Sequence, residues 1–235
     1  MPRQHYYLLA SLPVLHEPGS EPPITRRELL ERVTGSAGPL EVVESLLLGD
    51  DLLQHEAVLA GEMNAQETDP AMLSMAQMRD EQPLPEYLAA SRQEQAPTIA
   101  ADALWAAYFR HAAAVAKLAG SEFLAAWTAF EVALRNALAA ERAKALGLEA
   151  EGYLVAAELA DKDADLAGII GEWSAAPDPL AALRCLDMAR WHWIAARDAW
   201  FSYSDDEVAA YAARLSLLHR WHSLSRQQRE QTSAR

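Results

Sequence analysis

The distribution of proline is the sequence feature that most constrains how this chain can fold. Ten of the twelve prolines lie before residue 98, and only Pro177 and Pro179 follow. Because proline lacks a backbone N–H and interrupts a helix, we expect short elements in the first part of the chain and long ones later. The sequence thus suggests a proline-rich N-terminal helical portion (1–97), a main helical domain (98–224) and a polar, disordered tail (225–235).

The remaining composition favours helices throughout. Alanine supplies about one residue in five, and it is the strongest helix former. A side-chain oxygen just before a helix satisfies the first backbone N–H groups, and such cap residues are Thr25, Ser121, Ser204, Asp69 (before Pro70) and Asp178 (before Pro179). The pattern predicts an all-α, bundle-like array with helices at 25–34, 40–61 with a break permitted at Gly49, 70–80, 99–119, 121–146, 153–173, 179–202 and 205–224. Residues 6–13 fit a short helix or a strand, and the context favours helix.

Charge and composition exclude several classes of function. With 34 acidic and 20 Lys or Arg side chains, the net charge of −14 would repel nucleic acid. The longest apolar runs are too short to span a membrane. A single cysteine, Cys185, cannot form an internal disulfide, and no signal-peptide pattern opens the chain, so we expect a cytoplasmic protein.

Motifs for metals and nucleotides are absent or incomplete. A calcium-loop spacing is formed by Asp161, Asp163, Asp165 and Glu172. Leu166 occupies the position that should be glycine, so we interpret the carboxylates as an acidic helix start. His219 and His222 share one helical face, but zinc requires further ligands. No glycine-rich phosphate loop occurs, and we expect no cofactor, metal or small-molecule substrate.

Two groups of side chains are candidates for binding a partner. Tryptophan and arginine are typical of interface hot spots, and the candidates of this kind are Trp191, Trp193, Trp200 and Trp221. A large helical core is an equally good explanation for them. Met72, Met75 and Met78 are spaced by three, which fits either core packing or an adaptable surface. Cys185 fits a small core residue better than a nucleophile.

A polar trio interrupts the apolar helix predicted at 121–146. Glu131 and Arg135 are four residues apart, the spacing of a favourable helical ion pair, and Asn136 follows. If the stretch is buried, both charges need partners. We therefore weigh a half-exposed salt bridge against a buried network that organises neighbouring helices, and we regard a catalytic acid or base as the weakest option.

Three segments of the chain carry a resemblance to a known group of proteins. They are Tyr6–Pro13 (YYLLASLP), Phe130–Ala140 (FEVALRNALAA) and Tyr211–Trp221 (YAARLSLLHRW). These segments resemble an uncharacterised bacterial family encoded beside V-type ATP synthase subunits. That family is similar to a shortened form of the V-type ATP synthase rotor component designated C, or d in eukaryotic complexes, which is an all-helical, funnel-shaped protein.

The resemblance implies a function without chemistry of its own. The C-type rotor component sits on the membrane ring and receives the central stalk, so the implied partners are other V-type ATP synthase subunits. The implied location is the inner face of the membrane, as a peripheral part of the complex, and Glu131, Arg135 and Asn136 would organise its helices. The alternative is a free-standing helical adaptor or assembly factor that binds a partner helix. A metal-dependent enzyme is a third possibility, based on the carboxylates at 161–172.

Overall fold

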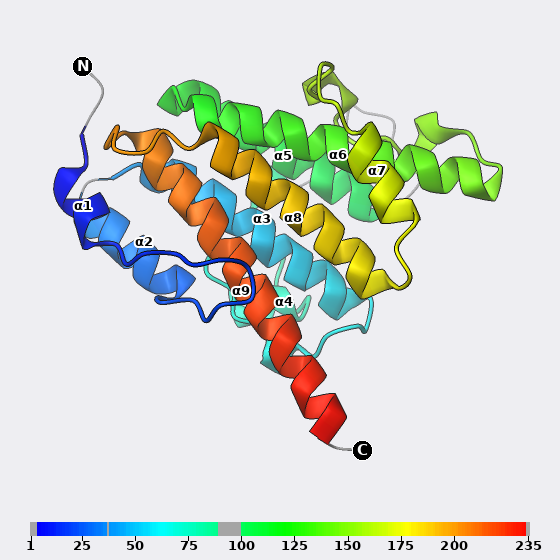
Figure 1. Cartoon of the computed structure of the whole chain (residues 1–235), viewed down its shortest axis with the longest axis horizontal. Helices are drawn as coiled ribbons and strands as arrows, with labels where there is room; N and C mark the ends of the chain where they lie inside the picture. The colour runs from blue at the N-terminus through cyan, green and yellow to red at the C-terminus, as the bar shows by residue number, and fades with distance from the viewer. Residues whose placement is uncertain (1–3, 37, 89–99, 234–235) are drawn as a thin grey trace.

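The structure, a computed structural model, describes residues 4–36, 38–88 and 100–233, and throughout these ranges its regular elements are helices (Figure 1). The long helices are α2 (Arg26–Gly35), α3 (Leu40–Leu59), α5 (Ala100–Ala119), α6 (Glu122–Leu146), α8 (Pro179–Arg197) and α9 (Asp205–Ser233). The shorter ones are α1 (Tyr6–Ser11), α4 (Met75–Met78) and α7 (Ala167–Ser174), with 3-10 turns η1 (Ala65–Glu67), η2 (Glu86–Leu88), η3 (Ala150–Tyr153) and η4 (Ala157–Leu159). The predicted all-α class is confirmed. Among the described helices, none combines the length and hydropathy of a membrane span.

Several helix ends follow the local signals in the sequence. The Thr25 side chain accepts a hydrogen bond from the Glu28 backbone N–H, and the Glu28 carboxylate accepts one from Thr25 in return. Ser121 and Asp178 also cap α6 and α8 with their side-chain oxygens. Residues 6–11 form a helix, as the context favoured, and α3 passes through Gly49 without a break. These ends are determined by side chains next to the helix in sequence, so they were predictable.

The helix predicted at 70–80 is wrong over its first half. The carboxylate of Asp51, on α3, accepts hydrogen bonds from the backbone N–H groups of Ala71, Met72 and Leu73. A distant side chain therefore satisfies the donors that a helix start would leave unpaired. The helix begins only after Ser74, whose capping box with Gln77 starts the four-residue α4.

The prediction of a helix at 153–173 is also wrong. That stretch contains 3-10 turns, an irregular segment and the short α7. Both groups of the Asn136 amide bind the backbone of Val155, at 2.8 and 2.9 Å, and the Asp161 N–H donates to the Ala129 carbonyl oxygen. The backbone here is thus hydrogen-bonded to α6 instead of to itself, which prevents a regular helix.

Two other helix boundaries differ from the sequence prediction. α8 ends at Arg197 instead of residue 202, because the Glu207 carboxylate accepts the N–H groups of Phe201 and Tyr203 in a non-helical loop. α9 runs through Ser233, nine residues past the predicted end, and so includes most of the segment expected to be disordered. Extending an existing helix is far easier than starting one. The boundary proposed near residue 97 falls in 89–99, outside the described residues.

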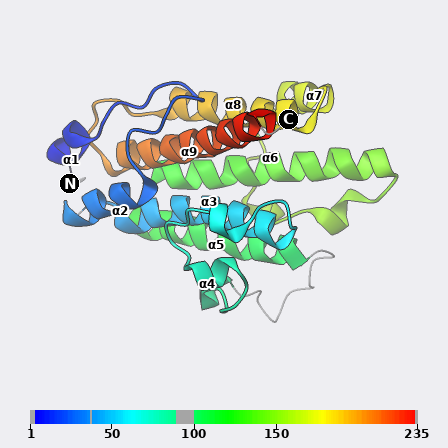
Figure 2. The same ribbon diagram turned by 90° about the horizontal axis from the view of Figure 1, so that it is seen from below.

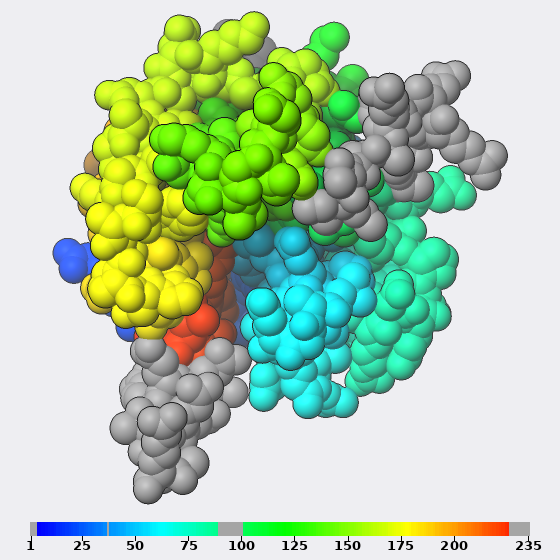
Figure 3. Space-filling view, turned by 90° about the vertical axis from the view of Figure 1, so that its right-hand side faces the viewer, coloured from blue at the N-terminus to red at the C-terminus, as the bar shows by residue number. Residues whose placement is uncertain are grey.

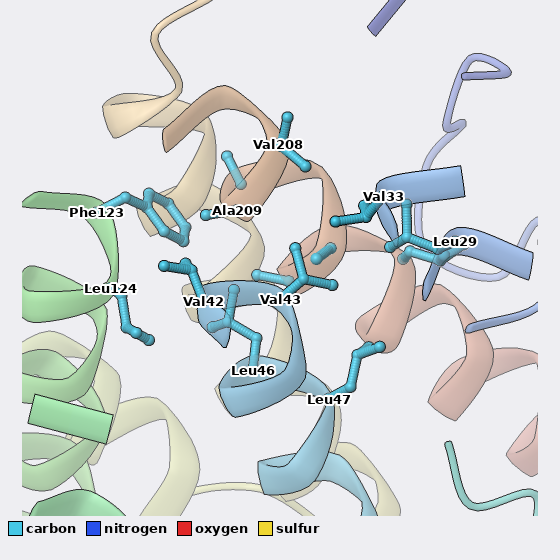
Figure 4. Close-up of a cluster of buried hydrophobic side chains, with 14 of the residues drawn as sticks. Leu29, Val33, Val42, Val43, Leu46, Leu47, Phe123, Leu124, Val208 and Ala209 are labelled. Atoms are coloured by element: carbon cyan, nitrogen blue, oxygen red, sulfur yellow. The ribbon is translucent and has the colours of Figure 1, made fainter. Parts of the chain in front are cut away.

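The long helices pack in layers, with α9 and α6 lying between α8 on one side and α3 with α5 on the other (Figure 2). The largest hydrophobic cluster joins helices from both ends of the chain. Figure 4 shows it where α2, α3, α6 and α9 meet, and its labelled members are Leu29, Val33, Val42, Val43, Leu46, Leu47, Phe123, Leu124, Val208 and Ala209. Elements before and after the proline-rich region therefore share one core.

Gly49 allows α3 and α5 to approach each other closely. A Cβ atom at this position would lie 2.3 Å from the Tyr108 hydroxyl oxygen, which in the structure donates to the Ser45 carbonyl oxygen. Both Tyr108 and Ser45 are buried. Glycine is therefore required here by packing, although it lowers the helix propensity of α3.

His219 links α9 to the segment before α2. Its Nε2 lies 2.9 Å from the Ile24 carbonyl oxygen, so that nitrogen is the N–H donor. Burial lowers the pKa of His219 below 6.5, the hydrogen bond to Ile24 raises it in part, and the nearby Arg26 and His222 lower it further, opposed by Asp69. The half-buried His219 is thus held in its neutral form, as in many structural histidines.

We predict that Gly49→Ala lowers the free energy of unfolding by about 1–3 kcal/mol, because the added methyl group must displace Tyr108 in a packed interior. Urea denaturation measures this change. Gly35→Ala is the matched control, since no atom lies within 4 Å of its added Cβ. An equal effect of the two substitutions would contradict the packing argument.

We predict that the free energy of unfolding falls as pH decreases below about 6.5, in part because His219 must take up a proton that its buried site disfavours. The folded pKa is below the unfolded one, so the unfolded state binds the proton first and is stabilised on acidification. Denaturant unfolding at a series of pH values measures the loss. His219→Gln keeps a donor for Ile24 and should reduce it as the pH is lowered through this range. His16→Gln, at an exposed position, should leave the wild-type pH profile.

Candidate binding groove and buried charge network

A groove with a volume of about 500 Å³ is the most prominent concavity in the described part of the chain. Its walls come from α3, α5, α6, α8 and α9, and residues 146–153 add to its rim. Figure 3 views the end of the molecule at which α6 terminates, and the surface there is hollowed between α6 and α3, beside α8 and α9. The groove therefore lies between the layers of the fold.

Aromatic side chains form much of the wall on the α5 side. Trp105 packs edge-on against Tyr108, with ring centroids 5.6 Å apart, and its Nε1 donates to Glu56 Oε2 at 2.9 Å. The Arg135 guanidinium lies over the Trp105 ring, 4.7 Å from its centroid, and contacts Asp102 at 3.4 Å. These contacts fix Trp105 in both position and tilt.

A buried charge network forms the inner end of the groove. The Arg190 guanidinium binds both oxygens of Glu131, at 2.7 and 3.0 Å, and also Asp187 Oδ1 at 2.9 Å. Asp187 Oδ1 also accepts a hydrogen bond of 2.7 Å from Arg220. Asp187 is only 1 % exposed, so this carboxylate depends on the two arginines. The arrangement joins α6, α8 and α9.

The same network continues into the N-terminal helices. Arg220 lies 3.4 Å from Asp50 Oδ1, and the other oxygen of Asp50 accepts a hydrogen bond from Arg26. Arg26 also donates to the backbone carbonyl of Asp69, while Asp51 lies 3.7 Å away. Alternating charges thus run from α2 through α3, α9 and α8 to α6.

Burial and charge shift the pKa values of the network in different directions. Burial lowers the pKa of Arg26, and the charge of Asp51 opposes this effect. Burial raises the pKa of Asp51, although three backbone N–H groups and Arg26 stabilise its charged form. For Arg190, burial lowers the pKa, but Glu131 and Asp187 more than compensate, so the pKa is raised overall. Arg190 therefore stays cationic at any physiological pH.

The three polar residues predicted on α6 do form part of this region, but not as an ion pair with each other. Glu131 binds Arg190 of α8, and Arg135 binds Asp102 of α5. Asn136 holds the backbone of Val155. The expectation of a pair between Glu131 and Arg135 is wrong, because each finds a better partner on a neighbouring helix. The alternative of a buried network fits their surroundings.

The four candidate tryptophans do not gather on one surface. Trp193 packs among Phe123, Trp127 and Phe130, and Trp221 is 8 % exposed. Trp191 packs partly buried against the main core. Trp200 is different, since 61 % of it is exposed. Of these four side chains, Trp200 is thus the one that a partner could reach freely.

The other candidates serve local structure. Met78 is fully buried, and Met72 and Met75 are half-buried. Cys185 is half-buried, and burial and Glu172 raise the pKa of its thiol. Asp161 and Asp165 accept backbone N–H groups two residues on, as in turns. No cluster of three or more metal-ligating side chains occurs within the described ranges.

Sequence reasoning missed the residues that complete the network, namely Asp50, Asp187, Arg190 and Arg220. One signal was available: Asp50 and Asp51 follow directly after an apolar run in α3. Aspartate is unfavourable inside a helix unless its side chain has a partner. The partners themselves, on α2 and α9, are far away in sequence and could not be assigned.

The comparison with family models places this region in a known family. A model described as "Protein of unknown function (DUF2764)" matches residues 63–235. The chain belongs to the DUF2764 family. The DUF2764 match contains α5 to α9 and thus Glu131, Asp187, Arg190 and Arg220, whereas Arg26 and Asp50 precede it. Neither the curated proteins nor the solved structures contained a match.

We predict that Asp187→Ala lowers the free energy of unfolding by about 3–5 kcal/mol, because it leaves two buried arginines without their shared carboxylate. Asp187→Asn retains an acceptor oxygen and should cost less. Denaturant unfolding gives both values. As a control, Glu141→Ala removes an exposed partner of Lys144 and should change the free energy by less than about 0.5 kcal/mol. Equal stabilities of the two Asp187 variants and the wild type would contradict a structural role for the network.

Proposed function

We propose that this protein is a non-catalytic subunit of a V-type ATP synthase or ATPase that connects the central rotor stalk to the membrane ion-translocating ring. The proposal takes its partners from the sequence resemblance to a shortened C-type rotor component. It places the protein in the cytoplasm, on the inner face of the membrane and peripheral to it. The reactions of ATP and ion transfer would take place in the companion subunits.

Contacts between the three resembling segments support this proposal. The hydroxyl of Tyr211, in the last segment, donates to the carbonyl oxygen of Pro13, in the first, at 2.9 Å. Glu131, in the central segment, is connected through Arg190 and Asp187 to Arg220, in the last. The segments are far apart in sequence but belong to one packed core. The residues that carry the resemblance are thus among those that hold the fold together.

The observation that carries the proposed partner contact is an exposed aromatic surface at the end of the molecule where α1 and the α8–α9 loop lie (Figure 1). We call it the aromatic end, and it consists of Tyr6, Tyr7, Trp200 and Phe201, which are 49, 94, 61 and 76 % exposed. Exposed aromatic side chains cost free energy in water and are typical of interface hot spots. This surface is therefore the best-supported contact with a partner subunit.

The loop beneath the aromatic end is held in an unfavourable conformation. Phe201 and Tyr203 have φ values of 63° and 55°, in the left-handed region that bulky residues avoid. The Tyr203 carbonyl accepts the His5 backbone N–H at 2.7 Å, and the Tyr6 and Tyr203 rings lie 4.5 Å apart. Backbone strain of this kind, fixed by surrounding contacts, is frequent where a surface is built for binding.

The packing suits a part that transmits force without chemistry. Long helices share one core, and the charge network crosses five of them. Packed interiors are poorly compressible and therefore transmit strain. The net negative charge would also reduce non-specific contact with anionic lipid.

Co-purification from the native organism tests the proposal. A tagged wild-type chain should retain stalk and ring subunits in stoichiometric amounts in the assembled motor. Recovery only with incomplete assemblies would instead support the alternative of an adaptor or assembly factor, which the same aromatic end would suit. Recovery without any motor subunit would overturn the proposal.

We predict that Trp200→Ala combined with Phe201→Ala reduces retention of the partner subunits by at least about tenfold, because both side chains are exposed anchors. Quantitative mass spectrometry of the purified complexes measures the loss. Leu118→Ala removes another exposed apolar side chain, 84 % accessible, away from the aromatic end and serves as control. The aromatic end would be excluded as the contact if both variants retained their partners equally.

A further inference from the structure

The groove has features that rigid packing alone does not require. Its volume of about 500 Å³ lies within the range of roughly 300–1,000 Å³ usual for small-molecule sites. Its lining residues on α6 extend from Trp127 to Leu146, which at 1.5 Å per residue is roughly 28 Å. It opens at the end of the molecule opposite the aromatic end (Figures 1 and 3). It is therefore independent of the surface assigned to partner subunits.

Two buried hydroxyl groups line the groove without a hydrogen-bond partner. Thr128 is 2 % exposed and Ser216 is 7 % exposed, and neither hydroxyl oxygen has a partner in the described part of the chain. Buried hydroxyls are normally satisfied, and leaving one unpaired is costly. Both can donate to an acceptor that enters the groove.

The charges in the groove are already compensated. Glu131 and Asp50 each use both carboxylate oxygens, in ion pairs with Arg190, Arg220 and Arg26. Arg135 is paired with Asp102. An additional full charge at the inner end would therefore meet charge of its own sign and would lose its hydration. The site favours a ligand without a net charge.

Hydrogen-bond donors nevertheless remain in excess. A guanidinium carries five N–H groups. In the described part of the chain, Arg220 uses two of them, toward Asp187 and Asp50, and Arg190 uses three. With the hydroxyls of Thr128 and Ser216, the inner end presents donors, while the outer walls are apolar.

We propose that the groove binds a neutral, amphipathic small molecule with a flat apolar body and at least one acceptor oxygen, such as an aromatic ketone. The acceptor oxygen points to the hydroxyls and guanidinium N–H groups at the inner end. The apolar body lies between Trp105 and the leucine and alanine side chains of α6. This ligand site is separate from the role proposed above and stands or falls independently of it.

The test uses the full chain and the fluorescent probe 6-propionyl-2-(dimethylamino)naphthalene, which is neutral and carries one ketone oxygen. Saturable binding at one probe per chain, with a blue shift in emission, is expected. 2-(Dimethylamino)naphthalene, which lacks the ketone, should bind at least about fivefold more weakly, as should the anionic 8-anilinonaphthalene-1-sulfonate. Absence of saturable binding, or equal affinity for all three probes, would overturn the proposal.

Variants assign the binding to the groove. Ala139→Phe fills it and should abolish probe binding, whereas Ala125→Phe, on an exposed position of the same helix, should not. Thr128→Val conserves shape but removes a donor, and it should weaken the ketone probe about 2- to 10-fold while leaving 2-(dimethylamino)naphthalene unaffected. Circular dichroism confirms that each variant is folded. Undiminished binding to folded Ala139→Phe would place the probe elsewhere and contradict the site.

A crosslinking experiment separates a small molecule from a polypeptide. A photoreactive benzoylphenylalanine at Leu138, which lines the groove, is illuminated in intact cells. Covalent capture of another polypeptide would show that a protein segment occupies the groove and would overturn the proposal. Crosslinks confined to this chain or to a small adduct, together with probe binding, support it.

Discussion

The carboxylate of Asp187 is the interaction on which the rest of this structure depends. It is almost completely buried and is shared by Arg190 and Arg220. A buried charge is tolerated only if it is paired with good geometry, so α8 and α9 are restricted to positions that preserve both contacts. Glu131 extends the restriction to α6 and Asp50 to α3. An apolar contact of the same area would allow the helices to slide, whereas this network defines their register.

The network also explains why a groove persists within the bundle. Charged side chains occupy the groove walls on α3, α6 and α9 and cannot collapse on one another as leucines would, because their partners fix their directions. Gly49 adds a second constraint by bringing α3 against Tyr108 of α5. The groove is thus bounded by a charged end that repels further charge and by aromatic walls that accept apolar matter. The aromatic end lies at the far side of the fold, so binding at one surface need not compete with binding at the other.

The success of sequence prediction differed among the helices for a physical reason. α6 was predicted to within a residue, because Ser121 and Gly147 lie next to its ends and its apolar stripe is regular. The stretches 70–80 and 153–173 have comparable local signals, but side chains of Asp51 and Asn136 bind their backbones from other helices. Among the site residues, Glu131 and Arg135 could be recognised as charges in an apolar helix. Their partners on α8 and α5 could not, since pairing four residues apart was the only contact visible in the sequence.

The sequence by itself determined that the chain is helical, where most long helices begin, and that it carries no familiar nucleotide or metal motif. These properties follow from propensity, capping and composition, which act over a few residues. Only the tertiary structure decided which charges meet, that three of the candidate tryptophans are packed while Trp200 is exposed, and that a groove with unpaired hydroxyls lies between the described helices. These outcomes depend on contacts between residues far apart in the chain, such as Asp50 and Arg220, which are separated by 170 positions. No local pattern specifies such contacts.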